Sequence, residues 1–127
     1  MQIHHTGIAT RDADRLIDLY EDLFDAPAVH EEEFDGLRVV FLDLGNGYFE
    51  LLEPIKHATV ARFLDRHGPG VHHVAVATED IEAALQTARG RGIECIDNEP
   101  REGAWGHDVA FLHPSDTGGV LFEFVEQ

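Results

Sequence analysis

Two halves of the sequence are related, and this internal repeat limits the possible folds more than any other feature. Segment 3–12 aligns with segment 71–80, and each contains an apolar run with a His-His pair, followed by an Ala-Thr pair and an aspartate. Two further pairs of segments match, 39–42 with 109–112 and 49–51 with 122–124. A duplicated unit implies that equivalent positions in the two halves have related roles.

Each half has the pattern of a βαβββ module. Asp12 and Asp80 are the expected N-caps of two helices, because apolar residues follow each aspartate along the chain at intervals of three and four residues. The turn Gly45-Asn46-Gly47 predicts a hairpin. Its strands are expected at residues 36–43 and 48–53, and their counterparts at 107–113 and 119–125.

The two modules are expected to form one α+β domain that covers residues 1–127. A module of about 60 residues buries too little surface to be stable alone, so both are expected to share one curved mixed sheet with the helices outside. Module 1 is expected at about residues 1–56, a linker helix at about 57–69 and module 2 at about 70–127. Gly68-Pro69-Gly70 is the predicted end of the linker helix.

The charge balance excludes one class of partner. Nine lysines and arginines against 25 aspartates and glutamates give a formal net charge of −16, and such a field repels nucleic acids and anionic membrane surfaces. Lys56 is the only lysine. An acidic, lysine-poor surface is typical of a protein from a salt-rich cytoplasm, where screening weakens the repulsion between like charges; the alternative is an ordinary acidic protein.

The single cysteine, Cys95, excludes an intramolecular disulfide and a cysteine-based zinc cluster. It lies in the run Ile93–Ile96, which favours a packed strand residue over a nucleophile. The first residues show no charged segment followed by an apolar one, so a cytoplasmic location is expected.

Four residues of two chemical types fall at equivalent positions of the two halves. His5 and His73 lie on the opening strands, and Glu50 and Glu123 on the last strands. Side-chain alternation places small residues beside each histidine and puts each carboxylate on an apolar face. Two imidazoles and two carboxylates suit a divalent cation such as cobalt, zinc, manganese, nickel or iron, and a bound cation would offset the cost of burying the carboxylates. The sequence therefore predicts one metal site, with the shared sheet around it.

The other histidines are expected to have different roles. His4 and His72 point to the opposite face of their strands, toward helices or as supports of the ligands. His113 precedes a proline at the end of a strand and is either a substrate contact or part of a turn. The segment 103–106 is either a mobile loop over a ligand or a tight turn. The remaining histidines are expected to be isolated and solvated, namely His30, His57, His67 and His107.

The motifs resemble those of the vicinal oxygen chelate superfamily, which includes glyoxalase I, bleomycin resistance proteins, extradiol dioxygenases and methylmalonyl-CoA epimerases. The resemblance covers nearly the whole chain. The His-His strands are typical of the superfamily. The segments Glu50-Leu51-Leu52-Glu53-Pro54, Phe111-Leu112-His113-Pro114 and Val120-Leu121-Phe122-Glu123 are more typical of the epimerases.

The resemblance implies a metal-dependent proton transfer at the carbon α to the thioester of an acyl-CoA, in a homodimer. The metal ligands fall on His5, Glu50, His73 and Glu123. Epimerisation needs two bases, and Glu123 and Glu50 are the predicted pair. Some members of the superfamily place a catalytic carboxylate at the position of Val39, so the identity of the second base is open in this sequence. The alternatives are a glyoxalase I-like lyase and a non-catalytic binding module. Arg38, Arg101 and Lys56 are possible contacts for the phosphates of coenzyme A.

Overall fold

The computed structural model describes all residues 1–127 as eight strands, three α-helices and two short 3₁₀-helices. The predicted α+β class and the two βαβββ modules are confirmed. By their contacts the residues divide into an N-terminal unit, residues 5–72, and a C-terminal unit, residues 1–4 with 73–127. The α-helices are too short and too polar to span a lipid bilayer.

The N-terminal unit holds the strand order β2-β3-β4-β1. Strand β1 runs parallel to β4, and the other neighbours are antiparallel. The hairpin predicted around Gly45-Asn46-Gly47 joins β3 and β4. The elements are β1 (Gln2–Ala9), α1 (Ala13–Phe24), β2 (Ala28–Phe34), β3 (Leu37–Asp43), β4 (Tyr48–Pro54) and α2 (Ala58–His67). Helix α2 is the predicted linker helix, and Gly68 caps its C-terminus as expected.

The C-terminal unit repeats this pattern with the order β5-β8-β7-β6. Strand β8 runs parallel to β5 and antiparallel to β7. The elements are β5 (Gly70–Thr78), α3 (Ile81–Gly90), β6 (Arg101–Glu102), the 3₁₀-helix η1 (Ala104–Gly106), β7 (Asp108–Phe111), the 3₁₀-helix η2 (Pro114–Asp116) and β8 (Phe122–Glu126). The second strand of the module is therefore reduced to the two residues of β6.

The strand expected at Ile93–Ile96 is absent, and this prediction was wrong. Cys95 forms only an isolated bridge with Leu112. Ile96 and Asp97 still donate their N–H groups to the carbonyl of Phe111, but the N–H of Phe111 donates to the side chain of Asp97, whereas in a regular strand it would donate to a backbone carbonyl. Cys95 still packs, half-buried, against the core of the unit, as predicted.

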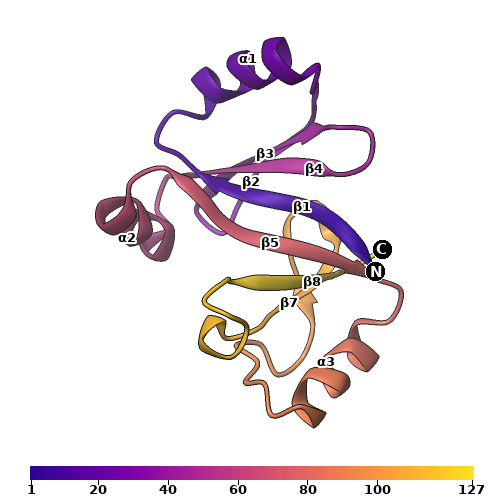
Figure 1. Ribbon diagram of the computed structural model, residues 1–127. Coiled ribbons are helices and arrows are strands. Elements are labelled where there is room, and N and C mark those ends of the chain that lie inside the picture. The colour runs from indigo at the N-terminus through magenta and orange to yellow at the C-terminus, as the bar shows by residue number, and fades with distance from the viewer. The chain divides into compact units, whose positions relative to one another are not determined.

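Each unit packs a helix against one face of its strands. In the N-terminal unit α1 covers β3 and β4 (Figure 1), and its core is the buried cluster Ala13, Ala26, Val40, Leu42 and Leu51. In the C-terminal unit α3 packs on β7 and β8 around Ile81, Leu85, Ala88, Ala110 and Leu112. Because strand side chains alternate, the residues between these core positions point to the face that carries no helix.

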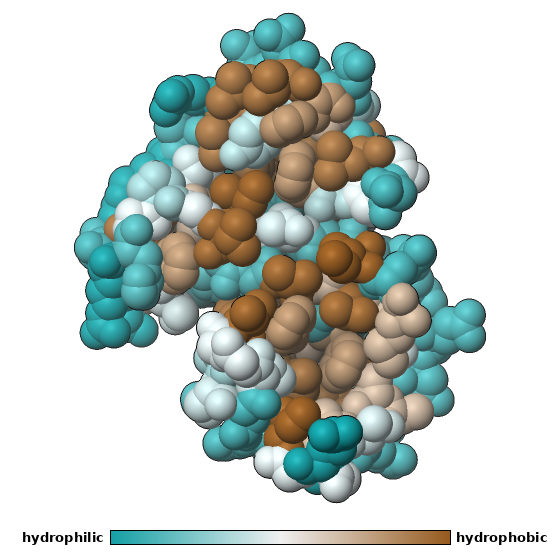
Figure 2. Space-filling view, viewed as in Figure 1, coloured by the Kyte–Doolittle hydropathy of each residue, from teal (hydrophilic) through white to brown (hydrophobic).

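Helix α1 also has an exposed apolar side. Leu19, Leu23 and Phe24 are 42%, 63% and 47% exposed, and Figure 2 shows apolar side chains on the surface of this helix at the top of the view. Tyr20 and Phe49 pack against Phe24 and hold one end of the helix on the strands.

The repeat is preserved in the hydrogen bonds at the helix starts. In α1 the carboxylate of Asp12 accepts the N–H of Arg15, and the N–H of Ala13 donates to Glu53. In α3 Asp80 accepts the N–H of Ala83, and Ile81 donates to Glu126. Thr10 and Thr78 accept the N–H groups of the two capping aspartates. The predicted N-caps are therefore confirmed, and the repeated threonine and aspartate are explained by helix capping.

Removing either cap is expected to lower stability. Asp12→Ala and Asp80→Ala should each reduce the free energy of unfolding by about 1 kcal/mol, because orphan N–H groups at the helix start lose their acceptor. Urea unfolding followed by circular dichroism measures the change. Asp18→Ala, at an exposed position inside α1, is the matched control. Equal unfolding midpoints for Asp12→Ala and the control would contradict the assigned cap.

Candidate functional site

The N-terminal unit buries a histidine against a glutamate on the face opposite α1. His5 Nε2 lies 3.3 Å from Glu50 Oε1, and both residues are at most 5% exposed. The parallel register of β1 and β4 pairs Gly7 with Glu50, so the strand residue beside the carboxylate has no side chain. Phe41 pairs with Glu50 from β3 and sets its ring edge-on to His5, with 5.6 Å between centroids.

The C-terminal unit repeats the same arrangement residue for residue. His73 Nε2 lies 3.4 Å from Glu123 Oε1, and both side chains are buried. Ala75 pairs with Glu123 across β5 and β8, in the place that Gly7 holds in the other unit. Phe111 pairs with Glu123 and meets the ring of His73 at 5.4 Å, again edge-on. The sequence prediction that each half unites one imidazole and one carboxylate on an apolar face is therefore confirmed.

The donors of each pair fit a divalent metal ion. A buried carboxylate is costly without a compensating charge or donor, and a neutral imidazole beside it supplies the second ligand type of zinc, cobalt, manganese and nickel sites. The small residues Gly7 and Ala75 leave space next to the carboxylates. Each unit therefore presents half of the predicted ligand set, and the joining of the two halves into one centre stays a prediction.

The histidines outside these pairs have structural partners. His72 meets the ring of Phe63 on α2, in accord with the predicted helix-facing role. His4 is buried and contacts the ring of His107 edge-on at 5.2 Å. The prediction that the remaining histidines are isolated was wrong, because each contacts a carboxylate or an aromatic ring, namely His30, His57, His67 and His107. The His57 side chain caps α2 by accepting the N–H of Val60, a role that the sequence pattern there does not reveal.

The predicted substrate contacts lie in ion pairs and turns. Arg38 pairs with Asp14, Glu31 and Glu53, and its hydrogen bonds to Glu31 and Asp14 raise its pKa. Arg101 pairs with Asp97 and sets its guanidinium over the ring of Phe111 at 5.7 Å. The ring of His113 caps η2 by accepting the N–H of Ser115. These roles in the structure leave the predicted contacts with a substrate untested.

Segment 103–106 forms the turn that was one of its two predicted structures. It contains η1, and Trp105 adopts a positive φ of 64° beside His107. Gly103 lies so close to Val109 that a Cβ there would approach its methyl groups to 2.9 Å, which explains the glycine.

One titratable pair on the helix-free face of the N-terminal unit was missed. His30 Nε2 lies 3.1 Å from Glu32 Oε1 on β2, and the two side chains are 27% and 29% exposed. Charged residues dominate this strand, so its sequence lacks the apolar alternation that would have revealed it. Pairing with β3 places His30 opposite Phe41 and Glu32 opposite Val39.

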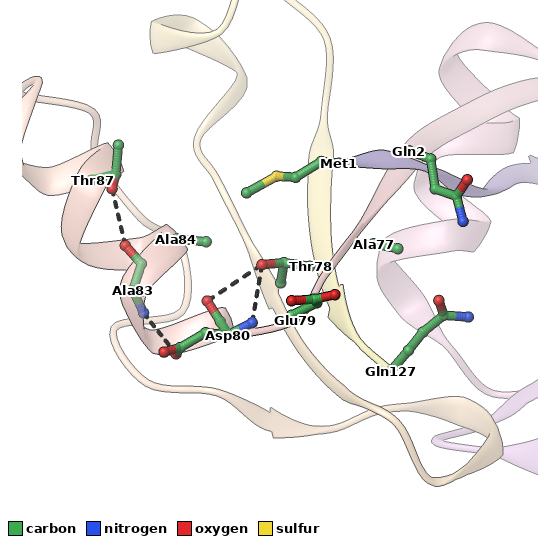
Figure 3. A pocket seen from close by; sticks show the side chains of 10 residues that line it. All are labelled: Met1, Gln2, Ala77, Thr78, Glu79, Asp80, Ala83, Ala84, Thr87 and Gln127. Carbon is green, nitrogen blue, oxygen red and sulfur yellow. Dashed lines mark hydrogen bonds between the residues drawn. The ribbon is translucent and has the colours of Figure 1, made fainter.

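A separate hollow of about 680 Å³ lies between β5, α3 and the chain ends (Figure 3). The polar groups that Thr78, Asp80 and Thr87 present there are engaged in hydrogen bonds at the start of α3 or within it. None of the predicted site residues lines it. This hollow borders the start of α3 and lies outside the candidate site.

Comparison with known proteins identifies the family. A family model described as the Glyoxalase/Bleomycin resistance protein/Dioxygenase superfamily matches residues 4–111. The chain belongs to this superfamily. Within it, the mitochondrial methylmalonyl-CoA epimerase of Homo sapiens is 35% identical over 127 residues, which cover 96% of this chain and 72% of that protein.

Solved epimerases agree with the structure over the whole chain. A Streptomyces coelicolor methylmalonyl-CoA epimerase variant in complex with 2-nitronate-propionyl-CoA matches with a TM-score of 0.92 and 36% identity, covering 100% of this chain and 94% of that one. A methylmalonyl-CoA epimerase in complex with methylmalonyl-CoA and ammonium matches with a TM-score of 0.91 and 36% identity, covering 99% and 94%. The superfamily predicted from the sequence motifs is therefore confirmed.

Proposed function

We propose that this protein is an isomerase that interconverts the two epimers of methylmalonyl-CoA by moving the proton on the carbon α to the thioester. The observation that carries the proposal is the buried His–Glu pair, which recurs with the same register and nearly the same distance in both modules. The relatives named as methylmalonyl-CoA epimerases, matched over nearly the whole chain, support this choice of substrate.

His5, Glu50, His73 and Glu123 would hold the divalent metal ion, whose identity among cobalt, zinc, manganese and nickel is open. When bound, such an ion acts as a Lewis acid that stabilises negative charge on the thioester oxygen. The residues around the pairs keep the ligands oriented. Phe41 and Phe111 pack edge-on against the two imidazoles and limit their rotation.

Glu123 is the proposed base of the C-terminal unit. A carboxylate can accept the α-proton while the electrons of the broken C–H bond delocalise toward the thioester oxygen. Inversion of the carbon requires that a second group return a proton to the opposite face. Glu50, at the equivalent position of the other module, is the second base that the sequence predicts, and this role stays a prediction.

Direct assay separates this proposal from its alternatives. The protein should epimerise each pure epimer of methylmalonyl-CoA and leave the glutathione hemithioacetal of methylglyoxal unchanged. The reverse preference would assign a glyoxalase I-like lyase. Binding of either molecule without turnover, by a preparation that holds no divalent ion, would assign a binding module.

The remaining predictions on partners and location go with this function. An acyl-CoA is the proposed substrate, and a second copy of the chain is the proposed partner. A cytoplasmic location is also proposed. Analytical ultracentrifugation tests the homodimer, since a monomer at micromolar concentration would contradict it.

Salt is expected to stabilise the protein and to improve substrate binding. From about 0.01 M to about 1 M KCl the Debye length falls from about 30 Å to about 3 Å, which screens the repulsion within a chain of net charge −16. The urea midpoint should therefore rise, and the KM for the polyanionic thioester should fall. An unchanged midpoint and an unchanged KM over this range would contradict the prediction.

A further inference from the structure

The His30–Glu32 pair lies on the same face of the sheet as the proposed ligands of the N-terminal unit. Antiparallel pairing sets His30 opposite Phe41, and Phe41 opposite Glu50 on the next strand. Residues directly opposite one another in a sheet point to the same side. The ring of His30 accordingly lies 6.2 Å from that of Phe41, whose other neighbour is His5. Phe41 therefore separates two His–Glu pairs on one surface.

The repeat breaks at this pair. In the C-terminal unit the strand equivalent to β2 is β6, where Arg101 lies opposite Val109. Val109 is the repeat equivalent of Val39, and Val39 lies opposite Glu32. Matching places next to the two candidate half-sites thus hold a carboxylate in one unit and a guanidinium in the other. The strands that carry these two residues also differ, since β2 has seven residues and β6 has two.

Epimerisation needs a second acid/base, and the carboxylate of Glu32 can fill this role. Glu50 is buried beside His5 as a proposed metal ligand, whereas Glu32 is 29% exposed and can exchange a proton with water. His30 Nε2 lies within hydrogen-bond distance of Glu32 Oε1, at 3.1 Å, and orients this carboxylate. Glu32 lies opposite Val39 on β3, and the Cβ atoms of such cross-strand pairs are about 5 Å apart.

We propose that Glu32, held by His30, is the second acid/base of the epimerisation, so that Glu50 serves as a ligand alone. The inference rests on the proposed function. Glu123 removes the α-proton from one face of the carbon, and the electron pair of that C–H bond moves into the enolate. The protonated Glu32 then gives its proton to the opposite face, where a new C–H bond forms as the carbonyl returns. The reverse reaction exchanges the roles, and water resets both carboxyl groups.

The test compares three glutamine variants of the metal-loaded protein, because glutamine keeps the shape of glutamate and removes its basicity. Glu32→Gln should lower epimerisation by about 100-fold or more with an unchanged metal content. One epimer should still exchange its α-proton for deuterium without inversion, since Glu123 serves that face. Glu33→Gln, an exposed neighbour on the other face of β2, is the matched control and should stay near wild type. Glu50→Gln changes a proposed metal ligand, so its rate is expressed per bound metal ion, and on this basis its loss of epimerisation should be smaller than that of Glu32→Gln.

The outcomes separate the inference from the function beneath it. If Glu32→Gln epimerises at nearly the wild-type rate, Glu32 is not the second base. If Glu50→Gln with its metal bound loses epimerisation instead, the second base is Glu50. If Glu32→Gln no longer exchanges the α-proton of either epimer for deuterium, the assignment of one base to each face of the carbon is also contradicted. If the wild-type protein exchanges the α-proton of neither epimer, both the proposed function and the role of Glu32 are wrong.

Discussion

Replacing His73 with alanine is expected to lower metal affinity by more than about 100-fold and to reduce turnover to background. Changes in groups that only support a metal ligand already cost about 10- to 100-fold in affinity, and His73 is a proposed ligand itself. The substitution also leaves Glu123 buried without the imidazole 3.4 Å away. Metal content after dialysis, measured by mass spectrometry of the elements, and epimerisation rate check the result.

The chain offers matched controls for this experiment. His5→Ala should behave as His73→Ala does, because the two units place these histidines alike. His67→Ala should keep its metal and its rate, since that ring lies on α2 against Phe63. Circular dichroism shows whether each variant is folded. Full metal content in folded His5→Ala and His73→Ala would contradict the ligand assignment.

The second large effect is expected at Glu123. In Glu123→Gln the amide oxygen can still coordinate a metal ion, but the side chain can no longer accept the α-proton. We therefore expect metal content to be retained and epimerisation to fall by about 100- to 10,000-fold, the usual contribution of a positioned acid or base. The measurements are the metal content and the rate of epimerisation, starting from each pure epimer.

Glu99→Gln, at an exposed position of the same unit, is the control for the loss of one negative charge. A Glu123→Gln variant that epimerises normally would show that Glu123 is no base and would remove the two-carboxylate mechanism. A variant that loses both metal and activity would place Glu123 among the ligands without assigning it the proton transfer.

The paired site residues were predictable because the internal repeat and the alternation of strand side chains select the same positions. The repeat selected His5, Glu50, His73 and Glu123, and strand alternation placed each on the face away from the helices. The structure confirms the grouping within each unit and adds what no single strand shows, namely the register that sets Gly7 and Ala75 beside the carboxylates. Register depends on which strands become neighbours, and the sequence of one strand does not contain that information.

The residues that were missed lie where the local pattern is weak. Strand β2 carries a run of glutamates, so its pairing with β3, and with it the position of Glu32 opposite Val39, was not predicted. The run Ile93–Ile96 is apolar enough to suggest a strand, but the N–H of Phe111 donates to the side chain of Asp97, whereas in a regular strand it would donate to a backbone carbonyl. His57 was expected to be solvated, although a histidine ring nitrogen can cap a helix when a turn presents it.

The central claim is that the protein removes and returns the proton α to a thioester. The most direct measurement incubates the metal-loaded protein with each pure epimer of methylmalonyl-CoA in deuterated water and follows the α-proton by nuclear magnetic resonance and mass spectrometry. The account predicts that both epimers lose the proton signal, gain one deuterium and converge on the same mixture of epimers. Retention of the α-proton by both epimers, in a preparation shown to be folded and to contain its metal, would contradict it.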